Sequence, residues 1–98
     1  MIDYLKKYNL TDEDLNEIKT VFNKDIINNF EIMMDNVCLI LDELRSIGVT
    51  NIKNMILNRP DICFSDLESL REKIAKFDKE LIKYVIENDP NNLINFDI

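Results

Sequence analysis

The sequence predicts an all-α protein that forms a single helical domain over residues 1–98. One glycine and two prolines are too few for a turn-rich β architecture, and a hydrophobic content of 46% suits a packed helical core. Apolar residues recur at helical spacing, with helix start and stop signals between the segments. We therefore expect one modest core inside five to six short helices, arranged as a small irregular helical-repeat array or as an orthogonal bundle.

The stretch Leu44–Leu70 contains the clearest start and stop signals. Gly48 follows a long apolar-periodic segment, and a glycine there takes the left-handed conformation that satisfies the last helical carbonyls. We expect the preceding helix to end near Ser46 or Ile47. Thr50 is the expected N-cap of the next helix, which is short and presents three apolar residues on one face, namely Ile52, Met55 and Ile56.

Pro60 should end this short helix, because proline has no N–H to donate and restricts the residue before it. Ser65 and Glu68 have the spacing of a capping box, so a further helix is predicted over Asp66–Phe77. Its expected apolar stripe consists of Leu67, Leu70, Ile74 and Phe77.

The N-terminal segments are less regular. Residues Ile2–Tyr8 predict a short helix, and Thr11 with Asp14 predicts the start of a second one. Its buried face should contain Leu15, Ile18, Val21 and Phe22. We predict a break within residues 23–29, where Asn28–Asn29 offers a fresh cap; the alternative is a continuous helix.

The segment Phe30–Ser46 is predicted to be the longest helix. Cys38 falls on its polar side, so we expect this cysteine to be less buried than most. Ile32 and Leu39, seven residues apart, form a second small stripe that either a neighbouring helix or a partner covers. The main apolar arc, which should face the core, consists of Phe30, Met33, Met34, Val37, Ile40, Leu41, Leu44 and Ile47.

A last helix is predicted between Asp78, as its cap, and Pro90. Its expected buried face consists of Leu81, Ile82, Val85 and Ile86. The four large apolar residues that follow are untypical of a disordered tail, and they are Leu93, Ile94, Phe96 and Ile98. Together with Ile2–Tyr8, they are candidates for a partner surface or a homodimer interface.

An internal repeat relates the fourth and last predicted helices at a spacing of 30 residues. Upstream, the segment LTDEDLNEIKTVF resembles GVTNIKNMIL once two residues are inserted. Helical periods of this length are typical of solenoid arrays. The pairs that match at this spacing are Ile52 with Ile82, Met55 with Val85, Ile56 with Ile86, Asn58 with Asn88 and Pro60 with Pro90.

This pattern resembles the repeat of the mitochondrial transcription termination factor (MTERF) family. The resemblance covers Leu44–Leu70 well and Thr11–Pro90 loosely. It implies left-handed triple-helical repeat units and, from the family's activity, binding of double-stranded nucleic acid along a basic concave groove. The matching residues are Leu44, Gly48, Val49, Ile52, Ile56, Leu57, Pro60 and Leu70.

The chain lacks the residues of most catalytic and metal sites. It contains no histidine, which excludes histidine bases, most hydrolase triads and nearly all zinc sites. Cys38 and Cys63 lie far apart and form no CxxC motif, which favours a reducing cytoplasm. The N-terminal residues lack the apolar core of a signal peptide. We expect a cytoplasmic protein without enzymatic activity, cofactor, metal or membrane contact.

The charges are unevenly distributed within a net charge of −7. Residues 1–43 hold ten acidic and four basic side chains, whereas residues 44–84 hold eight basic and six acidic ones. The sequence therefore favours a protein-binding or regulatory module with a protein partner or a second copy. The alternative is nucleic-acid binding through the mildly basic middle, at Arg59, Arg71, Lys73, Lys76, Lys79 and Lys83.

Overall fold

The structure, a computed structural model, describes residues 1–98 and confirms the all-α prediction. The chain contains no strand, and none of its helices has the length and apolar character of a membrane-spanning segment. The helices are η1 (Asp3–Tyr8), α1 (Asp12–Val21), α2 (Lys24–Ile32), α3 (Met34–Ser46), α4 (Lys53–Asn58), η2 (Pro60–Phe64), α5 (Leu67–Ile74), α6 (Lys79–Asn88) and η3 (Pro90–Phe96), where η denotes a 3₁₀-helix.

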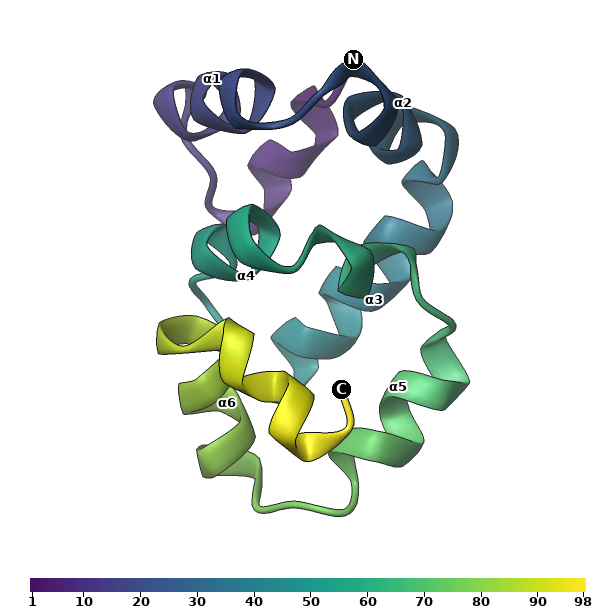
Figure 1. The fold of residues 1–98 in the computed structure, drawn as a ribbon, viewed down its shortest axis with the longest axis vertical. Coiled ribbons are helices and arrows are strands. Elements are labelled where there is room, and N and C mark those ends of the chain that lie inside the picture. Colours follow the sequence, from purple (N-terminus) through teal and green to yellow (C-terminus); the bar gives the residue numbers. More distant parts are fainter.

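Helix α3 runs through the middle of the molecule, which measures 34 × 22 × 22 Å. The N-terminal helices η1, α1 and α2 lie at one end of the long axis, and the connection from α5 to α6 forms the other end (Figure 1). Helix α3 packs against η2 and α5, while α4 packs against α6, η2 and η3. The chain thus surrounds one core rather than two.

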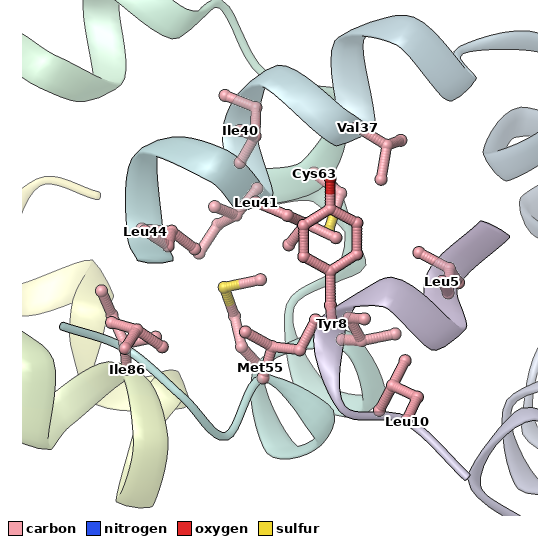
Figure 2. Close-up of a cluster of buried hydrophobic side chains, with 14 of the residues drawn as sticks. Leu5, Tyr8, Leu10, Val37, Ile40, Leu41, Leu44, Met55, Cys63 and Ile86 are labelled. Carbon is pink, nitrogen blue, oxygen red and sulfur yellow. The ribbon is translucent and has the colours of Figure 1, made fainter. Parts of the chain in front are cut away.

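The core consists of 23 buried apolar residues, and no polar side chain is buried. Figure 2 shows Met55 of α4 projecting toward α3, where Leu41 and Leu44 lie. The ring of Tyr8 enters the same cluster from η1. Complete burial of Ile2 and Leu5 means that the N-terminal segment belongs to this core. The predicted apolar partner surface at Ile2–Tyr8 therefore does not exist.

The start of α1 confirms the prediction for this segment. Thr11 and Asp14 form a complete capping box, in which the Thr11 side chain accepts from the Asp14 N–H and the Asp14 carboxylate accepts from the Thr11 N–H. Leu15 and Ile18 are buried as expected, but Val21 is 55% exposed. The buried face of α1 is consequently shorter than the apolar pattern predicted.

The predicted break within residues 23–29 lies at Asn23, the first residue of that range. Asn23 caps α2 by accepting from the Ile26 N–H at 3.0 Å, so Asn28–Asn29 lies inside the helix instead of capping a new one. A second break at Met33, which the periodicity did not predict, divides the expected Phe30–Ser46 helix. The Tyr4 hydroxyl donates to the Phe30 carbonyl at 2.6 Å. In a continuous α-helix this carbonyl would accept from the Met34 N–H.

The end of α3 has the predicted geometry. Gly48 has a φ of +99°, and the N–H groups of Gly48 and Val49 donate to the carbonyls of Arg45 and Leu44, both at 3.0 Å. This pair of hydrogen bonds is a Schellman motif. A side chain at residue 48 would be strained at that φ and would meet the Lys83 side chain.

Two predicted caps are wrong. Thr50 does not cap α4, which begins at Lys53; its N–H and hydroxyl donate instead to the Glu87 carboxylate, at 2.9 and 3.2 Å. Ser65 forms no capping box with Glu68, because its hydroxyl donates to the Ile62 carbonyl. The neighbouring Asp66 caps α5 by accepting from the Ser69 N–H at 2.9 Å.

The 30-residue recurrence is visible in the backbone. After α4, Arg59 adopts φ −138° and ψ 60°, and Pro60 opens η2. After α6, Asp89 adopts φ −149° and ψ 57°, and Pro90 opens η3. The matching Asn58 and Asn88 side chains each donate to the carbonyl four residues earlier. Two segments thus share one helix, turn and 3₁₀-helix unit.

The C-terminal segment packs largely as predicted. Asp78 caps α6 by accepting from the Leu81 N–H at 3.0 Å, and Ile82, Val85 and Ile86 are buried. Leu81 is 46% exposed, which contradicts its predicted burial. In η3, Phe96 meets Phe77 edge to face, with ring centroids 5.0 Å apart. These contacts fix η3 against the domain (Figure 1).

Candidate partner-binding surface

Three side chains along the end of α2 and the first turns of α3 form a surface that we call the outer strip: Ile32, Asp35 and Leu39. Ile32 is 80% exposed and Leu39 is 52% exposed. Asp35 and Leu39 are one turn apart on α3, so their side chains are neighbours. Ile32 precedes the break at Met33 and lies within about 11 Å of Asp35 along the chain.

Helix η1 packs along one flank of the outer strip. The Tyr8 hydroxyl donates to the Asp42 carboxylate at 2.9 Å, and the Arg45 guanidinium lies 4.5 Å from the centre of the Tyr8 ring. Burial and the Asp42 contact raise the pKa of the Tyr8 hydroxyl above its ordinary range. Tyr8 therefore acts as a neutral packing residue.

The segment from η2 to α5 packs along the other flank. The Asn36 amide donates to the carbonyls of Cys63 and Ser65, at 3.2 and 2.9 Å. Glu43 accepts from the Arg71 guanidinium at 2.8 Å. With both flanks of α3 occupied and its buried face in the core, Leu39 remains exposed on the outer side of α3, and Ile32 remains exposed at the end of α2.

A separate cleft of about 330 Å³ opens between η2, α5 and η3. Its apolar lining consists of Ile62, Leu70, Ile94 and Ile98. Arg59 is held at its edge by two hydrogen bonds to Asp61, at 3.0 and 2.9 Å, and by one to the Ile98 carbonyl at 2.8 Å. The cleft balances two cations, Arg59 and Lys73, against two carboxylates, Asp61 and Asp97, and so has no net charge of its own.

The six cationic residues predicted for nucleic-acid contact do not form one available face. Arg59 is occupied by Asp61, and Arg71 bridges Glu43 and Glu68, both at 2.8 Å. The remaining four make no ion pair within 4.0 Å, and they are Lys73, Lys76, Lys79 and Lys83. Of these, Lys73 lines the cleft and Lys83 lies beside Gly48.

The cysteine and carboxylate side chains, which bind metals or act as nucleophiles in many proteins, are buried or paired at several positions in this chain. No group of three or more cysteine or carboxylate side chains is placed to hold a metal ion. Cys63 is fully buried, and burial raises the pKa of its thiol to about 12. In the acidic segment at the start of α1, Asp12 pairs with Lys6 at 2.6 Å and Asp14 with Lys53 at 3.2 Å.

The six residues predicted as a partner surface separate into three groups. Ile32 and Leu39 lie on the outer strip, while Ile94 and Ile98 line the cleft, where Ile94 is 70% exposed. Leu93 is completely buried and Phe96 packs on Phe77, so neither offers a partner surface. No family model, curated protein or solved structure matches this chain. The MTERF resemblance therefore stays a prediction.

Proposed function

We propose that the protein is a non-enzymatic protein-binding or regulatory module. The observation that carries this proposal is the outward placement of Ile32, 80% exposed, and Leu39, 52% exposed, on a surface whose flanks are already packed. Isolated exposed apolar residues are ordinary, but two of them on either side of an unpaired carboxylate form a small anchor surface. The recurrent helix, turn and 3₁₀-helix unit supports the further proposal of a short MTERF-like array.

A direct test is cross-linking with mass spectrometry in cells that produce the protein, repeated with the Leu39→Ser variant. We expect one recurrent protein partner with the native chain and its loss with the variant. Leu81→Ser is the matched control, because Leu81 is 46% exposed on the distant helix α6 and should leave the partner in place. A native chain without any recurrent protein partner contradicts the proposal.

The second candidate is nucleic-acid binding, which the four unpaired lysines favour and the net charge of −7 opposes. A gel-shift assay at low salt with duplex DNA and duplex RNA separates the two candidates. We expect no complex at roughly tens of micromolar, where even non-specific binders associate. A complex that weakens steeply with salt, and that is lost on combining Lys76→Glu with Lys79→Glu, favours nucleic acid instead.

A further inference from the structure

We propose that the outer strip binds a basic amphipathic helix of a partner protein, in which apolar side chains cover Ile32 and Leu39 and a lysine or arginine faces Asp35. This inference rests on the proposed function and names the class of partner. It follows from the charge of the strip, the free state of Asp35 and the shape left by the two packed flanks.

The charged side chains of residues 31–43, the stretch that contains the strip, are all negative. Residues 31–43 contain four carboxylates and no lysine or arginine. Three of them are engaged, Glu31 by the Met1 amino group, Asp42 by the Tyr8 hydroxyl and Glu43 by Arg71. Asp35 makes neither an ion pair nor a side-chain hydrogen bond, and it stands beside Leu39 on the exposed face. A cationic side chain of the partner can therefore pair with the Asp35 carboxylate beside the exposed Leu39 side chain.

The geometry suits a helical partner better than an extended one. The strip crosses the break at Met33, because Ile32 is the last residue of α2, whereas Asp35 and Leu39 lie one turn apart on α3. An amphipathic partner helix presents apolar side chains three or four residues apart on one face, so one of them can cover Leu39 on α3 while another covers Ile32 at the end of α2. The backbone of α3 is hydrogen-bonded internally and offers no sheet edge for an added strand.

The net charge of −7 favours the same partner chemistry over longer distances. A cationic partner is attracted to the whole molecule before it docks, and the attraction weakens as salt rises. An acidic partner would instead be repelled by the N-terminal half, where ten acidic side chains outnumber four basic ones. A second copy of the chain is disfavoured on this strip, because it would bring Asp35 close to its own equivalent.

The probe is a synthetic helical peptide with leucines at i, i+4 and i+7 and lysines around them, titrated into the full-length protein by calorimetry. We expect saturable binding that weakens with salt. Leu39→Ser should weaken it about fivefold or more, because truncating a central anchor removes more than about 1 kcal/mol. Asp35→Lys should weaken it about tenfold, because it replaces an attraction by a repulsion.

Two control variants separate the strip from non-specific effects. Glu72→Lys makes the same change in net charge on α5, and Leu81→Ser removes an apolar side chain of similar exposure on α6. Both should bind the peptide within about twofold of the native chain, as expected for surface sites outside an interface. Equal weakening by the controls overturns the proposal, and so does equal binding of a peptide with glutamate in place of lysine.

Different experimental results would contradict this inference and the proposed function. If the basic peptide does not bind but cross-linking still finds a Leu39-dependent protein partner, the partner is not a basic helix and the proposed function stands. If sedimentation velocity shows that Leu39→Ser dissociates a dimer of the native chain, the strip joins two copies and this inference is wrong. If neither a peptide nor a protein partner binds, both are wrong.

Discussion

Glu87 Oε2 lies 2.9 Å from the backbone nitrogen of Thr50 and accepts its hydrogen bond. The same oxygen accepts from the Asn51 N–H at 3.0 Å, and the Asn54 amide donates to the Glu87 carbonyl at 3.1 Å. A residue of α6 thus holds the entry to α4, a role that the sequence assigned to Thr50. This contact joins the two segments that share the 30-residue recurrence.

Replacing Glu87 by alanine should lower the free energy of unfolding by about 1 to 2 kcal/mol, because two N–H groups lose a charged acceptor. Glu87→Gln should cost less, since its amide oxygen still accepts. Urea denaturation followed by circular dichroism measures both values. Glu72→Ala is the control, because Glu72 makes no hydrogen bond or ion pair through its side chain; an equal loss in this variant contradicts the role of Glu87.

The stability of the protein should fall as the solution becomes acidic. Burial alone raises the pKa of Glu87, but the hydrogen bonds from the Thr50 and Asn51 N–H groups outweigh it and hold the pKa below its ordinary value of 4.5. A depressed pKa in the folded state means that the unfolded chain binds protons first. The contribution of Glu87 is therefore complete above pH 4.5 and disappears as the pH falls through the folded-state pKa.

The variant Glu87→Gln isolates this contribution. Its free energy of unfolding should decline less steeply than that of the native chain between about pH 5 and pH 3, the range in which carboxylates titrate. Other carboxylates with lowered pKa values, among them Asp14 and Asp61, leave a residual decline in the variant. Parallel pH profiles of the two proteins would show that the Glu87 contact is absent in solution.

Replacing Tyr4 by phenylalanine should weaken the break at Met33. The Phe30 carbonyl loses the hydroxyl donor at 2.6 Å and becomes free to accept from the Met34 N–H. We expect a loss of about 1 kcal/mol in unfolding free energy, typical of one hydrogen bond, together with slower hydrogen exchange at Met34. Tyr84→Phe is the control, because Tyr84 is 63% exposed. Unchanged exchange at Met34 would mean that Tyr4 does not cause the break.

The two thiols should differ in reactivity. Cys63 is fully buried with a pKa raised to about 12, whereas Cys38 is half-buried at the flank of α3. Iodoacetamide near pH 8 should therefore modify only Cys38 in the folded protein and both thiols in urea, because the thiolate is the reactive form. Mass spectrometry of the Cys38→Ser variant provides the check: native-state labelling of that variant would show that the core opens around Cys63.

Most signals that act within a few residues of chain were predictive, and the capping box of Ser65 and Glu68 was an exception. The capping box of Thr11 and Asp14, the cap at Asp78 and the Schellman stop at Gly48 all formed as predicted, because each depends on backbone groups within one or two turns. Periodicity also identified most of the buried residues. It misplaced Val21, Met34 and Leu81, which were predicted to face the core and are 55%, 43% and 46% exposed.

The sequence by itself determined the helical class, the helix ends at Gly48, Pro60 and Pro90 and the 30-residue recurrence of a helix and its proline stop, since these follow from local sterics and hydrogen bonding. The 3₁₀-helices η2 and η3 after the prolines were not predicted. Only the tertiary structure decided the break at Met33, the hydrogen bond from Thr50 to Glu87 and the ion pair of Arg71 with Glu43. In these three contacts the partners lie 26, 37 and 28 residues apart along the chain, so no local sequence pattern predicts them. The outer strip belongs to the same class, because packing of η1 and η2 on the two flanks of α3 decides which side chains stay exposed.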